Sequence, residues 1–254
     1  MILDTFELKG KSALVTGSSS GIGEAIAVAL AEAGADVACH GRSLDSTQRV
    51  RDTIASLGRR AFSVAGDLSD VDGPKRIISE IEAEFGRIDI LINNAGTIRR
   101  APAAEFSEDD WSLVINVNLS SVFRLAQAAG KGMLERGSGK IVNIASLLSF
   151  QGGITVPAYT AAKSGVAGLT KALANEWAAR GVCVNAIAPG YIETKNTTAL
   201  RTDETRNRQI LERIPAGRWG RPDDLAGAAV YLSSAASDYL HGHILVVDGG
   251  WMGR

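Results

Sequence analysis

Tyr159 and Lys163 are the residues whose types and spacing point most directly to chemistry. They stand four residues apart at the start of a predicted helix, so their side chains share one face and lie within reach of each other. A phenol with a reference pKa of ~10 is a poor base at neutral pH, but a neighbouring ammonium favours the phenolate and lowers that pKa. The pair is therefore a candidate general acid/base.

Two further polar residues are expected at the same place. Ser146 ends a strand predicted over 140–146, which puts its hydroxyl at the carboxyl edge of a sheet, where ligands of open α/β sheets bind. Asn118 lies on a long predicted helix and is a candidate to hold a water that links Lys163 to solvent. Residues of these types are usually ordinary surface residues. The inference of a catalytic site therefore depends on all four being expected at one edge of the sheet.

An alternation of strands and helices must position these residues. Apolar runs predict strands, and helical patterns lie between them. The predicted strands are 12–15, 36–40, 61–65, 88–93, 140–146, 183–188 and 244–247, and the predicted helices are 22–33, 46–57, 71–85, 108–136, 158–180 and 222–233. Because parallel neighbours need crossover connections, we predict a doubly wound α/β fold with helices on both faces, as one domain over 1–254. The Thr-rich stretch 191–213 is predicted to be a mobile substrate flap.

The stretch 16–23, TGSSSGIG, lies between the first predicted strand and the first predicted helix. A doubly wound sheet presents helix N-terminal amides to a pyrophosphate at this point. Gly17 permits the turn, Gly21 lets the backbone approach a ligand, and Gly23 lets the helix pack closely on the strand. A flexible loop without a ligand is the alternative. The remaining candidate cofactor contacts of this loop are Ser19, Ser20 and Ile22.

Two more loops are placed to contact a dinucleotide. A carboxylate after the third strand can accept a hydrogen bond from an adenine amino group, and small residues after the fourth let a ribose lie against the backbone. These residues are Asp67-Leu68 and Asn94-Ala95-Gly96. The second strand ends without a carboxylate for a ribose 2′-hydroxyl, whereas Arg42 can pair with a 2′-phosphate. We predict NADP(H), with NAD(H) as the alternative if Arg42 is only a solvated loop residue.

Composition limits the other partners. The chain has 27 basic and 28 acidic residues, so its net charge of −1 provides no field that would attract nucleic acid or a membrane surface. Cys39 and Cys183 are too few to suggest a disulfide framework or a metal cluster, and we predict no metal. Residues 1–11 lack the basic start and apolar core of a secretion signal, and no apolar run approaches the ~20 residues of a membrane span. We therefore predict a cytoplasmic protein.

Taken together, these motifs resemble those of the short-chain dehydrogenases/reductases over essentially the whole chain. They are TGSSSGIG at 16–23, NNAG at 93–96, NVNL around Asn118, Ser146, YTAAK at 159–163 and PGYIET at 189–194. The resemblance implies that Tyr159 is the general acid/base, Ser146 orients the substrate oxygen, Lys163 lowers the tyrosine pKa and Asn118 supports a proton relay. Tyr159 and Lys163 would also contact the cofactor.

The same resemblance extends to the nicotinamide end of the site and to the assembly. It implies that one loop anchors the nicotinamide carboxamide, and that the protein has a seven-stranded sheet and forms a homotetramer. The residues of that loop are Pro189, Gly190, Ile192 and Thr194.

Several shorter stretches resemble the sugar-acid members of this family. They are 98–100, 148–153, 187–191, 214–220 and 248–251. A sugar acid needs a cation for its carboxylate and polar groups for its hydroxyls, and an arginine suits the carboxylate best. The candidate substrate residues are Arg99, Arg100, Gln151 and Lys195. Such members are usually described with NAD, and Arg42 departs from that expectation.

Two alternatives stay open at this point. The chain could reduce another carbonyl, such as a 3-oxoacyl thioester or gluconate at another carbon, because this scaffold does not determine the substrate. It could also be a nucleotide-sensing protein without catalysis, although the Ser146, Tyr159 and Lys163 set is intact. At the C-terminus, the segment 251–254 is expected to be frayed.

Overall fold

A computed structural model of residues 1–254 contains one sheet of seven parallel strands, in the order β3-β2-β1-β4-β5-β6-β7. The doubly wound, seven-stranded sheet expected from the sequence is confirmed. The strand order reverses between β1 and β4, so a ligand crevice forms where these two strands end. The strands are β1 (Ser12–Val15), β2 (Asp36–Gly41), β3 (Ala61–Ala65), β4 (Ile90–Asn93), β5 (Gly139–Ile144), β6 (Val182–Pro189) and β7 (Ile244–Val247).

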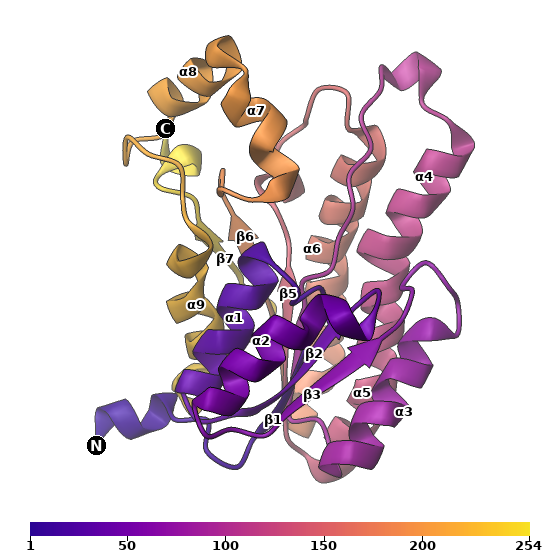
Figure 1. Cartoon of the computed structure of the whole chain (residues 1–254), viewed down its shortest axis with the longest axis vertical. Coiled ribbons are helices and arrows are strands. Elements are labelled where there is room, and N and C mark those ends of the chain that lie inside the picture. The colour runs from indigo at the N-terminus through magenta and orange to yellow at the C-terminus, as the bar shows by residue number, and fades with distance from the viewer.

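Helices cover both faces of the sheet (Figure 1). One face carries α1 (Gly21–Glu32), α2 (Leu44–Ser56) and α9 (Ala226–Ser233). The opposite face carries α3 (Gly73–Phe85), α5 (Ser121–Arg136) and α6 (Pro157–Trp177), with α4 (Glu108–Ile115) packed beside α6. The short helices α7 (Thr198–Thr202) and α8 (Glu204–Arg213) follow β6 and stand beyond the carboxyl edge of the sheet.

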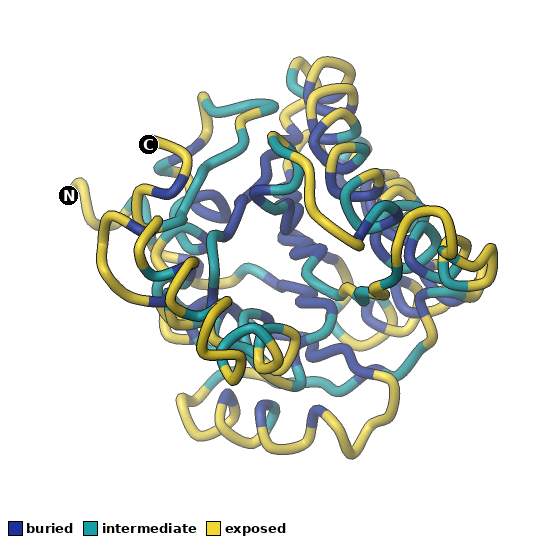
Figure 2. Tube along the Cα trace, turned by 90° about the horizontal axis from the view of Figure 1, so that it is seen from above, coloured by how far each residue is buried: buried dark blue, intermediate teal, exposed yellow.

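The core consists of two apolar layers, one on each face of the sheet. Successive strand residues point to opposite faces, so Val15 and Ile92 pack with Leu30 of α1, whereas Leu14 and Leu91 pack under α3 and α5. Figure 2 shows the buried residues gathered around the strands and the exposed residues on the outer sides of the helices. Both faces of the central strands are covered, and the ends of the strands carry the loops that form the site.

Three local differences from the sequence prediction bear on the site. Strand β5 ends at Ile144, and Ser146 instead caps a 3-10 turn, where its hydroxyl accepts a hydrogen bond from Leu148 N–H at 3.2 Å. The helix predicted over 108–136 is interrupted by a π-helical turn at Asn116–Ser120. The C-terminus is not frayed, because Trp251 is only 4 % exposed.

None of the helices combines the length and the apolar character needed to cross a membrane. No group of three or more His, Cys, Asp or Glu side chains gathers in a way that could hold a metal ion.

Candidate active site

Tyr159, Lys163 and Ser146 meet at the carboxyl end of β5. Tyr159 and Lys163 are one turn apart on α6, and the Lys163 Nζ lies 5.6 Å from the centroid of the Tyr159 ring. The Ser146 hydroxyl lies near the Tyr159 phenol, close enough to favour its phenolate form. Pro157 occupies the first turn of α6, where its fixed φ suits a helix start and its missing N–H costs no hydrogen bond. The sequence therefore places the tyrosine and lysine in the first two turns, facing the serine.

Hydrogen bonds tie α6 to the turn that carries Ser146. Ser149 Oγ donates to the Lys163 carbonyl oxygen at 2.7 Å, and Ser164 Oγ donates to the Leu148 carbonyl oxygen at 3.2 Å. The Lys163 Nζ donates to the carbonyl oxygen of Ile144, the last residue of β5, at 2.6 Å. These contacts hold the catalytic side chains in a constant relative position.

Burial changes the proton affinity of both ionisable groups. It lowers the pKa of Lys163 to about 8, so this amine still carries its proton at pH 7. It raises the pKa of Tyr159, an effect that the nearby Ser146 hydroxyl and the positive charge of Arg100 counter in part. The loss of hydration sets the net direction of this shift, and the expectation that Lys163 lowers the tyrosine pKa stays a prediction. Arg100 is the cation that favours the phenolate here.

Asn118 lies in the π-helical turn and is completely buried. Its Nδ2 donates to the carbonyl oxygens of Thr97 at 2.8 Å and Val114 at 2.9 Å, and its Oδ1 accepts from Thr97 N–H at 3.1 Å. The side chain thus attaches the segment after β4 to the helical layer. The proton relay expected at Asn118 stays a prediction.

The glycine-rich loop between β1 and α1 leaves no room for side chains. Gly17 has φ +64°, and a Cβ at Gly23 would overlap Asn94 Nδ2 and the Gly17 carbonyl oxygen. The first N–H groups of α1 have no acceptor within the helix, and the side chain of the N-cap residue Ser20 does not cap them. This arrangement of free amides fits the pyrophosphate of a dinucleotide.

The loops after β1 and β4 form one hydrogen-bonded unit. Asn94 Nδ2 donates to the carbonyl oxygens of Thr16 at 2.8 Å and Gly17 at 3.2 Å. In return, Thr16 Oγ1 accepts from the N–H groups of Asn94 at 2.9 Å and Ala95 at 3.0 Å. The side chain of Asn94 therefore shapes the loop, and the backbone of Ala95 and Gly96 is what faces the crevice.

His40, at the end of β2, is a positioning residue that the sequence analysis missed. It is 3 % exposed. Its Nδ1 accepts from Gly17 N–H at 3.3 Å, so the proton of the neutral ring is on Nε2, which lies 3.1 Å from the Gly66 carbonyl oxygen. Burial lowers the pKa of His40 and so favours this neutral form. A histidine inside an apolar strand gave no signal, because such residues usually belong to the core.

Arg42 and Asp67 lie near each other where β2 and β3 end. Asp67 Oδ1 accepts from Ser69 N–H at 2.8 Å and from Ser69 Oγ at 2.7 Å. These hydrogen bonds, with a smaller contribution from the Arg42 charge, lower the pKa of Asp67. Both charged side chains are exposed at this corner, whereas Leu68 is 5 % exposed and belongs to the core. Leu68 can contact a ligand only through its backbone.

The two candidate arginines after β4 differ in their surroundings. Arg99 Nε donates to Asp110 Oδ1 at 3.0 Å, so its charge is paired. Arg100 is exposed, and its charge acts on the Tyr159 phenol. Of the two arginines, Arg100 is the one whose charge acts on the Tyr159 phenol, whereas Arg99 is held by Asp110.

The loop after β6 passes over the glycine-rich loop. A β-bridge pairs Ile192 with Gly220 and anchors this segment. Thr194 Cγ2 lies 3.4 Å from the position that a Cβ at Gly21 would occupy, so the predicted carboxamide anchor is next to the phosphate cradle. Lys195 follows at the start of a 3-10 turn and is exposed.

Comparison with known proteins identifies this arrangement. A family model described as enoyl-(acyl carrier protein) reductase matches residues 17–252. The chain belongs to the short-chain dehydrogenase/reductase family. Members of this family are oxidoreductases that use a nicotinamide cofactor, and the residues expected from the family motifs stand in the corresponding loops here.

Individual members of the family are similar to the chain over its full length. The 2-dehydro-3-deoxy-D-gluconate 5-dehydrogenase of Bacillus subtilis (strain 168) is 58% identical, with 99% of this chain and 98% of the relative covered. The enzyme of the same name from Escherichia coli (strain K12) is 53% identical, with 100% of both covered. A crystal structure of gluconate 5-dehydrogenase from Burkholderia cenocepacia J2315, in complex with NADP and tartrate, is 42% identical, with a TM-score of 0.96 and 100% of both chains covered.

Proposed function

We propose that the protein is an NADP(H)-dependent 2-dehydro-3-deoxy-D-gluconate 5-dehydrogenase, which interconverts a secondary alcohol and a ketone on a sugar acid. The observation that carries this proposal is full-length identity of 58% and 53% to relatives of that name. The exposed Arg100, whose charge acts on the Tyr159 phenol, supports it. Residues 1–254 act as one domain in this proposal.

The chemistry follows from the positions of the side chains. The nicotinamide, when bound, supplies the acceptor or donor of the hydride. In the oxidation direction, the Tyr159 phenolate accepts the proton of the substrate hydroxyl, and Ser146 holds the reacting oxygen by a hydrogen bond. In reduction, Tyr159 returns the proton to the same oxygen. The Lys163 amine would hydrogen-bond the nicotinamide ribose, and Ile192 and Thr194 would hold the carboxamide.

The adenosine end of the site supports NADP(H). Arg42 is an exposed guanidinium at the end of β2. No carboxylate stands at this point to accept a hydrogen bond from a ribose 2′-hydroxyl. A planar guanidinium binds a phosphate through two parallel hydrogen bonds. Asp67 keeps one carboxylate oxygen outside its turn and would accept from the adenine amino group.

The substrate carboxylate would be bound by Arg100. Its charge is available, whereas the charge of Arg99 is neutralised by Asp110. Lys195 and Gln151 would contact the hydroxyl groups from the opposite side of the cleft, because they follow β6 and β5 respectively. This division assigns one of the two arginines to binding and the other to structure.

A second candidate substrate is gluconate, oxidised at C5. The similarity to the gluconate 5-dehydrogenase whose structure holds NADP and tartrate favours it. The two functions are separated by measuring NADPH oxidation or NADP⁺ reduction with a panel of acids. We expect the highest kcat/KM with 2-dehydro-3-deoxy-D-gluconate and its C5 ketone. A higher value with gluconate and 5-ketogluconate would replace the first assignment by the second, and activity only with 3-oxoacyl thioesters would overturn both.

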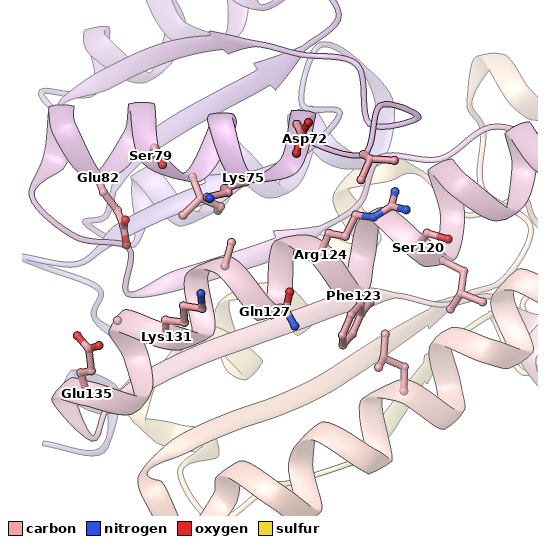
Figure 3. Close-up of a pocket in the computed structure, with 16 residues that line it drawn as sticks. Asp72, Lys75, Ser79, Glu82, Ser120, Phe123, Arg124, Gln127, Lys131 and Glu135 are labelled. Carbon is pink, nitrogen blue, oxygen red and sulfur yellow. The ribbon is translucent and has the colours of Figure 1, made fainter.

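The assembly and the compartment also belong to the proposal. We propose a homotetramer, in which a second copy packs against the face made by α4 and α5. Trp111 and Phe123 expose 39 % and 43 % of their surface on these helices. Figure 3 shows the groove that Phe123 lines, with α3 along one side and α5 along the other. Inside it, Arg124 Nη1 is buried without an acceptor, which a second copy could provide.

The unpaired cysteines support a reducing compartment. Cys39 and Cys183 are both buried and free, as is usual for cytoplasmic proteins. We therefore propose that the enzyme works in the cytoplasm.

A further inference from the structure

The C-terminal segment reaches the loop that follows the catalytic serine. Trp251 is 4 % exposed, and its indole Nε1 donates to Gln151 Oε1 at 3.3 Å. These residues are 100 positions apart in the chain. Gln151 follows the 3-10 turn that Ser146 caps, and that turn is tied to α6 through Ser149. A residue of the tail is therefore in direct contact with the scaffold of the active site.

This contact determines which way the Gln151 amide faces. An indole N–H is a donor only, so the atom that it meets must be the carbonyl oxygen of the amide. The NH₂ group of Gln151 then points away from Trp251 and donates to no protein atom. The side chain is half-buried, so this group is open to a ligand. The tail thus leaves an oriented and unused hydrogen-bond donor a few residues beyond Ser146.

Aromatic and charged contacts hold Trp251 in place. Its ring lies 4.7 Å from the ring of Tyr191, two residues beyond the end of β6, and the Arg213 guanidinium stacks over it at 4.0 Å. Arg254 Nη1 donates to the Glu212 carbonyl oxygen at 2.8 Å. Trp251 therefore touches the catalytic-serine loop, the start of the nicotinamide loop and the end of α8 at the same time.

We propose that Trp251 is a positioning residue for substrate binding, which orients Gln151 so that its amide NH₂ donates to an oxygen of a polyhydroxy acid. The inference rests on the proposed function in that it takes such an acid as the substrate. It adds a specific donor to the site and gives the C-terminal segment a role in recognition.

The test is a double-mutant cycle on the intact enzyme. Trp251→Phe keeps an aromatic ring against Tyr191 and Arg213 but removes the N–H, and Gln151→Met removes the amide. We expect each change to raise KM for the sugar acid about three- to tenfold, the range for one lost hydrogen bond, with kcat and the Kd for NADPH changed less than about twofold. Because both changes remove the same interaction, the double variant should be no worse than Gln151→Met alone.

Trp219 provides the matched control. It packs against the same Tyr191 ring, but its Nε1 donates to Asn207 Oδ1 at 2.7 Å, away from Gln151. Trp219→Phe should lower the Tm about as much as Trp251→Phe and leave KM unchanged. An unchanged KM in Trp251→Phe, or KM effects that multiply in the double variant, would show that the indole is only structural and would overturn the proposal.

A second variant leaves the tail untouched. Gln151→Glu keeps an oxygen acceptor for the indole but replaces the NH₂ donor, so we expect a raised KM with an unchanged Tm, and an unchanged KM would count against the proposal. A wrong substrate assignment appears differently, in the wild-type preference across the panel of acids. Calorimetric binding of D-gluconate to the NADP⁺-loaded variants gives the same comparison when turnover is low.

Discussion

The cofactor side and the substrate side of the site are built in different ways. The loops after β1 and β4 are held by short polar side chains that bind the backbone, such as Asn94, and by glycines whose neighbours exclude a Cβ, as at Gly17 and Gly23. The loops after β5, β6 and β7 are held by side chains, such as the aromatic contacts of Tyr191 and the indole of Trp251. Loops packed too closely for a Cβ preserve one geometry for a constant ligand, whereas large side chains can be exchanged to suit different substrates.

The charged groups on the two sides of the site also differ in what their charges act on. On the cofactor side, Arg42 lies near Asp67, away from Tyr159, and its proposed role is in the affinity for the cofactor. On the substrate side, the Arg100 charge reaches the catalytic phenol and lowers its pKa. If Arg100 binds the substrate carboxylate as proposed, the same cation also changes the proton affinity of Tyr159.

The largest effect is expected at the point where the two sides meet. Tyr159→Phe removes the group that transfers the proton, so kcat should fall about 10³-fold or more. The Kd for NADPH should stay within a few-fold, because the cofactor loops do not depend on the hydroxyl. Steady-state kinetics and fluorescence titration of NADPH measure the two quantities. Retention of substantial turnover by this variant would exclude Tyr159 as the acid/base.

The next effect tests the tight packing of the cofactor side. Gly23→Ala places a methyl group on the Gly17 carbonyl oxygen and Asn94 Nδ2, so the phosphate loop must shift. We expect the Kd for NADPH to rise by about one to two orders of magnitude, together with a lower Tm. Gly168→Ala is the control: it also adds a methyl group to a helix, but no atom lies within 4 Å, and it should stabilise slightly. Equal NADPH affinity in the two variants would contradict the role of Gly23.

The features of the site that the sequence predicts are those that depend on local patterns, and the features that it misses depend on contacts between distant residues. The glycine loop and the Tyr159-Lys163 pair depend on short spacings and on strand and helix patterns, which a sequence displays directly. The π-helical turn was missed because 108–136 has a continuous helical pattern, and the turn is stabilised by the contacts of Asn118 with Thr97, far from any helix signal. Periodicity carries no information about such contacts.

The missed side chains have the same explanation. His40 bridges loops 23 and 26 residues away, and Trp251 meets a partner 100 residues away, so neither role is visible in a local pattern. The choice between Arg99 and Arg100 depended on Asp110, one helix later. Adjacent residues of one type are indistinguishable until their partners are located in space.

Cofactor preference provides a test confined to the adenosine end. Arg42→Ala should raise KM for NADPH about 10- to 100-fold, because charge-assisted hydrogen bonds to the 2′-phosphate are lost, and should leave KM for NADH nearly unchanged. Steady-state kinetics with both cofactors measure the ratio. If NADH is the better cofactor of the wild type, or the ratio does not move in the variant, Arg42 is only a solvated residue and the NADP(H) assignment is lost.

A smaller effect separates the two arginines on the substrate side. Arg100→Met should raise KM for the sugar acid about tenfold, since a charge-assisted contact with the carboxylate is lost. Arg99→Met should change KM little, because the Arg99 charge is already paired with Asp110. The two variants make the same replacement at adjacent positions, so each is a control for the other. Equal KM values in both would mean that the carboxylate is bound elsewhere.

The finest test uses pH, and it addresses the coupling between binding and catalysis. In the oxidation direction, kcat/KM rises with pH as Tyr159 loses its proton, because the phenolate is the base. Arg100 lowers the pKa of Tyr159, so Arg100→Met should move this rise to higher pH. Arg99→Met should leave it in place. A profile of kcat/KM against pH for the wild type and both variants measures the shift. If Arg100→Met raises KM without moving the profile, Arg100 binds the substrate but does not tune the base, and recognition and proton transfer are independent in this site.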